Sequence, residues 1–199
     1  ITPNASSRIY DDKGRLITTV HAEENRIPVP ISQVPQNLQN AFVAAEDVRF
    51  YEHHGVDPRG ILRAVFANLT SGNATGQGGS TITQQLARNA FLTQEQTLKR
   101  KLLEVVLAFE IESKYTKKQI LEMYMNQIYF GQGCYGIQTA AHVYFGKDVK
   151  DLSLSQCAML AGLPNSPNYY SPFRSLEAAK YRQGIVLDQM AKYGYISAA

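Results

Sequence analysis

The chain has 199 residues, a length that predicts a single domain, and 44% of them are hydrophobic, which is enough for a buried core. Its net charge of +3 is too mild to indicate nucleic-acid binding, although it suits an anionic ligand or a membrane surface. No apolar run approaches the roughly 20 residues of a membrane-spanning helix, so an anchor, if present, would precede Ile1. The spacing of Cys134 and Cys157 matches no metal or redox motif, and both are interpreted as buried free thiols.

The first predicted element is a β-hairpin, with strand patterns at 7–10 and 15–20 around a Gly-containing turn. After a Pro-rich extended segment at 28–35 the pattern is helical almost throughout, so the domain is predicted to be mainly α. The expected helices are Gln36–Val48, Pro58–Leu69, Ser80–Ala90, Gln94–Lys114, Lys117–Gln127, Gly136–Tyr144, Leu154–Ala161 and Leu176–Tyr193. Capping boxes are expected at Thr93, Thr116 and Ser153.

A charged segment at 46–55 directly follows the apolar run 41–45. Glu46 would end a buried helix, where apolar surroundings raise the pKa of a carboxyl group and make it a candidate general base. The alternative is a helix end with solvated charges, and these residues alone do not decide between the two interpretations.

A second polar segment, 77–89, places Gly78 and Gly79 before Ser80 at a predicted helix start. Backbone N–H groups and hydroxyls that point outward from such a start bind phosphate, and Gln85 and Arg88 would extend the donor surface. The alternative is an ordinary glycine loop with a serine cap. The segment lacks the Gly-Lys-Ser/Thr ending of a P-loop.

The long helix 94–114 carries two patterns on different faces. Its apolar side chains recur at helical spacing and are predicted to be buried in the core: Leu98, Leu102, Val105 and Phe109. Arg100, Lys101 and Glu104 share another face, where two cations and a carboxylate could face a pyrophosphate. The alternative is a solvated ladder of ion pairs, worth about a few tenths of a kcal/mol.

A fourth segment, 120–131, is dominated by apolar and aromatic groups that are expected in the core, and Asn126 is its polar exception. Together, the four segments resemble, in order and in spacing, the family 51 glycosyltransferases. These are the peptidoglycan glycosyltransferase domains of class A penicillin-binding proteins and their monofunctional relatives. The resemblance covers nearly the whole chain, from about residue 7 to residue 190.

This resemblance implies one domain over residues 1–199, with a lysozyme-like, bilobal helical fold. A smaller jaw lobe at about 54–77 would lie on the membrane. The sequence of the jaw suits this placement, because a basic amphipathic helix without acidic residues is typical of a membrane interface. Its apolar positions are Ile61, Leu62, Val65, Phe66 and Leu69, with Arg59 and Arg63 toward the other side. An ordinary core helix is the alternative.

The family's reaction would be the polymerisation of lipid II into β-1,4-linked glycan strands, with inversion and release of undecaprenyl pyrophosphate. Glu46 matches the family's general base and Glu104 its second essential carboxylate. Further residues that match the family's substrate-binding positions are Asp47, Phe50, His53, Ser80, Thr81, Gln85, Arg88, Arg100, Lys101 and Asn126. Glu104 would orient the cations or bind a divalent metal, Mg²⁺ or Mn²⁺, and no organic cofactor is implied. Gln96 departs from the family, many of whose members carry Arg or Lys at this position.

The implied partners are lipid II, the lipid-linked nascent glycan, the membrane surface and moenomycin-type inhibitors, without nucleic acid. The implied location is the extracytoplasmic face of a bacterial membrane, and the hairpin favours a class A parent with a following transpeptidase domain. Two other functions stay open. A hydrolytic or lytic muramidase would also use two carboxylates, but it needs no pyrophosphate site. A non-catalytic membrane-docking domain would explain the basic apolar stretch but not Glu46 and Glu104.

Overall fold

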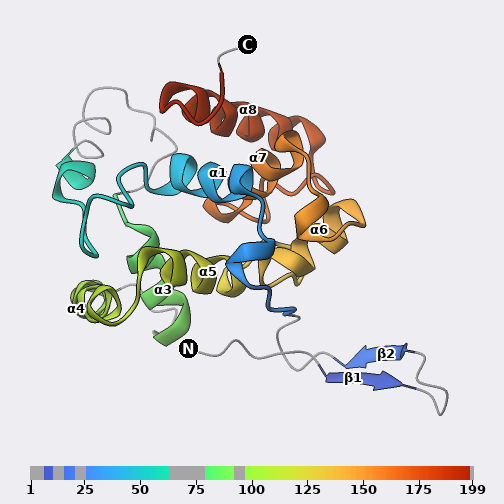
Figure 1. Ribbon diagram of the computed structural model, residues 1–199, viewed down its shortest axis with the longest axis horizontal. Coiled ribbons are helices and arrows are strands. Elements are labelled where there is room, and N and C mark those ends of the chain that lie inside the picture. The colour runs from blue at the N-terminus through green and yellow to red at the C-terminus, as the bar shows by residue number, and fades with distance from the viewer. Residues whose placement is uncertain (1–6, 11–15, 21–25, 63–78, 92–96, 198–199) are drawn as a thin grey trace.

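The computed structural model is a helical body with one two-stranded antiparallel sheet (Figure 1). The structure describes residues 7–10, 16–20, 26–62, 79–91 and 97–197. In the sheet, β1 (Ser7–Tyr10) pairs with β2 (Leu16–Val20), and Ser7 lies opposite Val20. The predicted hairpin and the mainly α fold class are therefore confirmed.

The helices match the expected ones to within a few residues at their ends. They are α1 (Gln36–Glu46), α3 (Ile82–Phe91), α4 (Leu98–Lys114), α5 (Lys117–Gln127), α6 (Ile137–Phe145), α7 (Leu154–Gly162) and α8 (Leu176–Lys192). Short 3₁₀ turns cover Ile31–Gln33, Val149–Asp151 and Leu163–Asn165. Residues 58–62 are helical, but the rest of the predicted helix at 58–69 and most of the jaw at 54–77 lie outside the described residues. The same holds for Gln96 and the capping box at Thr93.

Local sequence signals place several helix starts correctly. Thr116 and Ser153 form complete capping boxes at the starts of α5 and α7, in which side chain and backbone satisfy each other's donors. The cap of α4 was not predicted: the helix begins at Leu98, and the Thr97 hydroxyl accepts a hydrogen bond from the Arg100 amide. Both cysteines are free and buried, as the sequence predicts.

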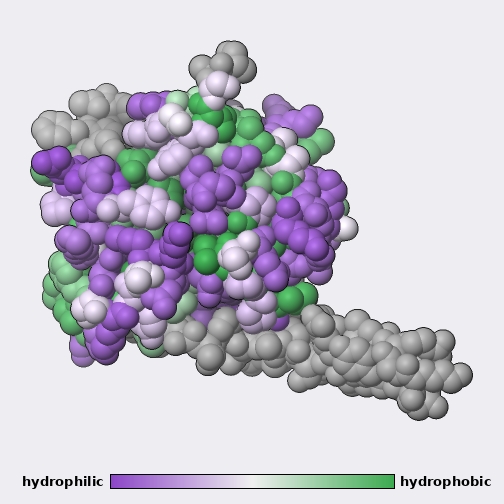
Figure 2. Space-filling model, viewed as in Figure 1, coloured by the Kyte–Doolittle hydropathy of each residue, from purple (hydrophilic) through white to green (hydrophobic). Residues whose placement is uncertain are grey.

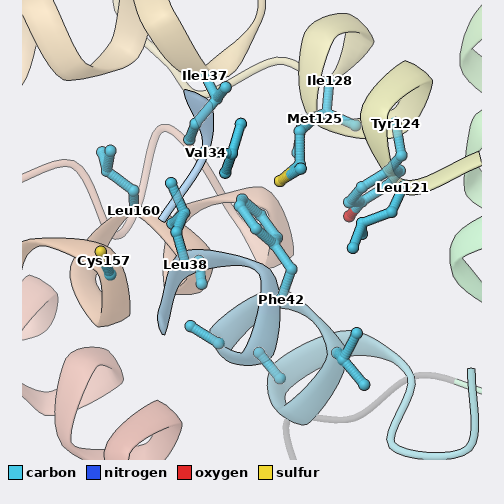
Figure 3. Packing of buried hydrophobic residues seen from close by; sticks show 14 of the residues in the cluster. Val34, Leu38, Phe42, Leu121, Tyr124, Met125, Ile128, Ile137, Cys157 and Leu160 are labelled. Carbon is cyan, nitrogen blue, oxygen red and sulfur yellow. The ribbon is translucent and has the colours of Figure 1, made fainter. Parts of the chain in front are cut away.

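Helix α1 crosses the middle of the helical body, with α7 and α8 on one side and α3, α4 and α5 on the other (Figure 1). Phe42 of α1 points into the core towards α5, where its ring meets Tyr124 edge-on at a centroid distance of 5.8 Å (Figure 3). A second edge contact joins it to Phe130 at 6.1 Å. Small buried residues occupy much of the rest of α1, which lets neighbouring helices approach closely. This packing fixes the end of α1, and therefore Glu46, inside the body.

The prediction that Leu98, Leu102, Val105 and Phe109 face the core is wrong for three of them, and Val105 is half-buried. Leu98 is 88% exposed, Leu102 69% and Phe109 52%. Helix α4 instead buries the face that carries Glu104, Ala108 and Ile111. Helical periodicity identifies an apolar stripe but not what covers it, and in α4 the small Ala108 allows close packing on the opposite side.

No helix among the described residues is long and apolar enough to cross a membrane. Most of the face seen in Figure 2 is hydrophilic, and hydrophobic residues appear at its left edge, over α4. We call the exposed apolar side of this helix the α4 outer face; it consists of Leu98, Leu102, Leu103, Val106 and Phe109.

Gly55 brings the loop after α1 against α4. Its φ of +101° lies in a region that side chains disfavour, and a Cβ built on it would sit 3.0 Å from the carbonyl carbon of Ala108. The contact is therefore one of backbone on backbone, which only glycine permits.

Candidate active site

Glu46 is the last residue of α1, and its side chain is only 10% exposed. One carboxylate oxygen, Oε2, accepts a hydrogen bond of 2.9 Å from the Gln85 amide of α3. The side-chain oxygen of Gln85 in turn accepts a hydrogen bond of 3.2 Å from the Tyr124 hydroxyl of α5. Burial raises the pKa of Tyr124 well above its usual value, so its hydroxyl stays a donor. Helices α3 and α5 thereby fix the orientation of the Glu46 carboxylate.

Burial also raises the pKa of Glu46 above its ordinary value, as the sequence predicts for a carboxyl at the end of a buried helix. The hydrogen bond from Gln85 and the charges of Arg182 and Arg88 counteract this effect, while Asp47 adds to it. The second oxygen, Oε1, has no hydrogen-bond partner among the residues that the structure describes. Glu46 therefore offers a buried, basic oxygen with an open position for a proton.

Sequence reasoning missed Arg182, a residue of α8 whose Nη2 lies 4.0 Å from Oε1 of Glu46. It is almost completely buried. A single arginine in an amphipathic helix normally indicates a solvated face, so no local signal marks it as part of the site. Only the packing of α8 on α1 brings the two charges together.

Asp47 and His53 form a buried support next to Glu46. Oδ2 of Asp47 lies 2.8 Å from Nε2 of His53 and accepts a bond of 3.0 Å from the Ile82 amide at the start of α3. Nδ1 of His53 accepts a bond from the Gly55 amide. Both side chains connect the loop after α1 to α3, and a carboxylate at a helix N-terminus is favoured by the helix dipole.

Three backbone donors at the start of α3 that the glycine turn was expected to offer to a phosphate are already used within the fold. The Thr81 amide donates to the Gln84 side chain, the Gln84 amide donates to Oγ1 of Thr81, and Asp47 occupies the Ile82 amide. The Thr81 hydroxyl itself donates to the carbonyl oxygen of Gly55 over 2.6 Å. These donors serve the fold and are not available to an anion.

Ser80, Lys101 and Glu104 come together at the junction of α3 and α4. The Lys101 ammonium donates to Oγ of Ser80 over 2.8 Å and to Oε1 of Glu104 over 2.7 Å. Glu104 is completely buried, whereas the Lys101 side chain is 48% exposed. The second oxygen of Glu104 is buried and has no hydrogen-bond partner in the described part of the chain. The carboxylate thus holds a lysine whose ammonium stays within reach of solvent.

The remaining predicted residues form two groups: two arginines on α3 and α4, and two residues that make contacts within the fold. Arg88 on α3 is half-buried, and its charge acts on Glu46; Arg100 is half-buried on α4. Phe50 is a core residue, and the Lys117 ammonium lies 4.6 Å from its ring centroid. Both ends of the Asn126 amide bond the backbone of Val29, at 3.0 and 2.8 Å. A contact of Phe50 or Asn126 with substrate stays a prediction.

The residues around Glu104 do not form a resident metal site. Nowhere in residues 26–62, 79–91 and 97–197 do three or more His, Cys, Asp or Glu side chains gather as metal ligands. One oxygen of Glu104 is occupied by Lys101. A divalent cation bound here would need further oxygen ligands from a phosphate-bearing substrate.

Replacing Asp47 with alanine is expected to lower the free energy of unfolding by about 3 kcal/mol, because His53 and the Ile82 amide both lose a buried, charged hydrogen-bond partner. Urea unfolding followed by circular dichroism measures the loss. Asp148→Ala is the control, since that carboxylate also bonds a histidine, His142, but is exposed; it should change stability little. Equal losses in the two variants would contradict the support role of Asp47.

Comparison with known proteins adds an independent line of support. The transglycosylase family model matches residues 13–191. The chain is 48% identical over 195 residues to penicillin-binding protein 1F of Bacillus subtilis (strain 168), which covers 98% of this chain and 27% of that protein. It is 52% identical over 190 residues to penicillin-binding protein 1A of Escherichia coli (strain K12), covering 96% and 22%.

A crystal structure of penicillin-binding protein 1A from Haemophilus influenzae is also similar, with a TM-score of 0.53 and 27% identity over 99% of this chain and 19% of that chain. The chain spans about a quarter of the length of the curated relatives. The family match covers most of the chain and includes every residue of the site described above. The chain therefore belongs to the transglycosylase family.

Proposed function

We propose that this chain polymerises lipid II into β-1,4-linked glycan strands, as a peptidoglycan glycosyltransferase that releases undecaprenyl pyrophosphate. The observation that carries the proposal is the pairing of two different carboxylates. Glu46 is a buried base with an open oxygen, and Glu104 holds a solvent-accessible lysine. The first suits a proton acceptor, and the second suits the binding of an anion.

Glu46 supplies the nucleophile half of the reaction. A sugar hydroxyl is a weak nucleophile at neutral pH, so its proton must leave as the new bond forms. Oε1 of Glu46 accepts the proton from the 4-hydroxyl of the acceptor sugar. At the same time, the oxygen of this hydroxyl attacks the anomeric carbon of the donor, from the face opposite to the leaving pyrophosphate. Gln85 donates to the other oxygen and is itself held by Tyr124, so the lone pair that takes the proton is already oriented.

The cations of α3 and α4 supply the leaving-group half. The bond between the anomeric carbon and the phosphate oxygen breaks, and its electron pair leaves with the pyrophosphate. Fixed positive charge stabilises this developing charge without a proton donor. Lys101, positioned by Glu104 and Ser80, is the cation with the best-defined place, and Arg88 and Arg100 add charge on the same two helices.

A muramidase would place a proton donor at the leaving sugar oxygen and would gain nothing from Lys101 and its buried carboxylate. The deciding experiment incubates the chain with lipid II and, separately, with finished peptidoglycan. Glycan strands formed from lipid II, inhibited by moenomycin, support the transferase. Release of soluble fragments from finished peptidoglycan, without polymerisation, contradicts it. Parallel reactions with Mg²⁺, Mn²⁺ or a chelator test for a metal bound together with the pyrophosphate.

The membrane surface is the proposed partner of the α4 outer face. This face is apolar and exposed, and Lys99, Arg100 and Lys101 are also on the helix, a composition typical of helices that lie in a membrane interface. Ile61 and Leu62, at the start of the predicted jaw, are exposed as well. A lipid-linked substrate requires such a surface, because its prenyl chain stays in the bilayer while the sugars react above it.

Introducing glutamate at Leu102 and Val106 together is expected to reduce binding to anionic phospholipid vesicles by about tenfold or more. Each charge carries a penalty for entering the interface, and a basic helix also loses electrostatic attraction. Vesicle sedimentation measures the effect. Leu176→Glu is the control, since Leu176 is similarly exposed but lies on α8. A loss of binding in the control as great as in the α4 variant would refute this orientation.

The greater length of the relatives extends the proposal to a longer protein that would contain this chain, which we call the parent protein. Two of the relatives are penicillin-binding proteins of which this chain covers about a quarter. We propose a class A parent in which a transpeptidase domain accompanies the transferase. The site would then face outward from the membrane, on the extracytoplasmic side, where lipid II is polymerised.

A further inference from the structure

We propose that Arg182 is a positioning residue for Glu46: its buried guanidinium, delivered by α8, keeps the base ionised and in place without occupying the oxygen that takes the proton. The inference rests on the proposed function, since it concerns the same base. It assigns a role in the reaction to the C-terminal helix, which contributes none of the four motif segments.

Arg182 is held by groups other than Glu46. Its side chain is 3% exposed, and Nε donates to the carbonyl oxygen of Gly162 over 3.4 Å. The guanidinium carbon lies 5.8 Å from the ring centroid of Tyr170, a distance suited to a cation–π contact. The position of the guanidinium is therefore set by α7 and the segment after it, and the base does not have to hold its own counter-charge.

Gly162 makes room for this arrangement. A Cβ at Gly162 would come within 2.9 Å of Cγ of Arg182, so the arginine stem crosses α7 directly over the glycine. Gly162 has ordinary helical backbone angles, and its conformation alone does not explain the absence of a side chain. The close passage of Arg182 does explain it.

The distance of 4.0 Å between Nη2 of Arg182 and Oε1 of Glu46 is what a base requires. A direct hydrogen bond would engage the lone pair that must accept the substrate's proton. A guanidinium much farther away would leave the buried carboxylate with less compensation, and burial favours the protonated form. At 4.0 Å the charge still favours the carboxylate, and Oε1 stays open.

The other groups that face Glu46 do not replace this charge. Gln85 and Tyr124 are neutral, and Asp47 is itself negative and disfavours ionisation of its neighbour. Arg88 on α3 is the second cation, and its influence on the pKa of Glu46 is smaller than that of Arg182. Because Arg182 is the stronger of the two cations, and the Gln85 hydrogen bond is present with or without it, removal of Arg182 should raise the pKa of the base, and the enzyme should need a higher pH to work.

The test compares the pH dependence of lipid II polymerisation in Arg182→Met, Arg182→Lys and Arg174→Met. Methionine keeps the apolar stem without the charge, and lysine keeps a positive charge without the planar guanidinium group. Arg174 is an exposed arginine over Tyr169, at 5.9 Å, and serves as the matched control.

For Arg182→Met we expect the acidic limb of the profile to move to higher pH, so that the rate loss at pH 6 exceeds that at pH 9 by about tenfold. Arg182→Lys should recover part of the shift, and the control should match the wild type.

A rate loss of the same size at every pH would overturn the inference, because it would show a purely structural role. If Arg182→Met does not fold, as judged by circular dichroism, Gly162→Ala is the second variant: it displaces the Arg182 stem and should move the same limb in the same direction. The inference would equally be overturned if the acidic limb of the pH profile stayed where it is in the wild type for both Gly162→Ala and Arg182→Lys. Failure of the proposed function looks different, since then the wild type and Arg174→Met would form no glycan at any pH.

Discussion

Glu46→Gln is expected to abolish lipid II polymerisation, with a loss on the order of a thousandfold or more, because an amide cannot take the proton of the attacking hydroxyl. The glutamine still fits the cavity and can still pair with Gln85, so the substrate should bind. Single-turnover measurements of glycan formation, together with a separate binding assay for lipid II, distinguish loss of chemistry from loss of binding. Near-normal polymerisation by this variant would eliminate Glu46 as the base.

The fold of Glu46→Gln should persist and, at neutral pH, be more stable than the wild type. The pKa of Glu46 is raised in the folded protein, so the folded state binds its proton more tightly than the unfolded chain does. This group's contribution to stability is greatest below the unfolded pKa and is lost as the pH rises through the folded pKa. At neutral pH, the ionised carboxylate of Glu46 therefore lowers the stability of the fold, and a neutral glutamine removes this loss. Glu52→Gln is the control, because Glu52 lies in the same segment but is exposed and pairs only with Arg49.

Glu104→Gln is expected to reduce turnover by about a hundredfold, equivalent to about 2.7 kcal/mol of transition-state stabilisation. The Lys101 ammonium loses the carboxylate that holds it 2.7 Å away and becomes free to move into solvent. The preorganised charge for the departing pyrophosphate is then lost. The rate constant for glycan formation at saturating lipid II measures the effect. A loss smaller than about tenfold would reduce Glu104 to a structural partner of Lys101.

Glu112→Gln provides a close control for this variant. Glu112 lies on the same helix, has a side chain that is only 7% exposed, and accepts hydrogen bonds from Lys117 over 2.7 Å and from the Thr83 hydroxyl over 2.6 Å. Its replacement should lower thermal stability while leaving the rate of polymerisation almost unchanged. If both glutamine variants lost activity in parallel with stability, the effect at Glu104 would be attributable to weakened packing of α4.

Features that depend on neighbouring residues could be predicted from the sequence. The capping boxes at Thr116 and Ser153 fix the starts of α5 and α7, because their donors and acceptors lie within four residues of each other. The position of Glu46 at the end of a buried helix follows from the apolar run that precedes it. The motif spacing also placed Glu104 and Lys101 on one face of a helix, and the structure joins them directly.

Features that depend on tertiary packing could not be predicted in this way. The stripe from Leu98 to Phe109 has the period of a buried face, yet α4 buries its other side. The Ile82 amide at the start of α3 donates to Asp47, which lies 35 residues earlier in the chain. Arg182 is separated from Glu46 by more than a hundred residues, and no spacing rule relates a cation on one helix to a carboxylate at the end of another.

The backbone contact between Gly55 and Ala108 makes α4 and the loop after α1 a single mechanical linkage. Packed backbone atoms are nearly incompressible, so a push on one segment displaces the other by almost the same amount. The Gly55 amide donates a hydrogen bond to His53, which in turn contacts Asp47, the neighbour of Glu46. If the α4 outer face rests on a bilayer as proposed, lateral pressure on that face would be passed through this contact to the candidate active site as a displacement.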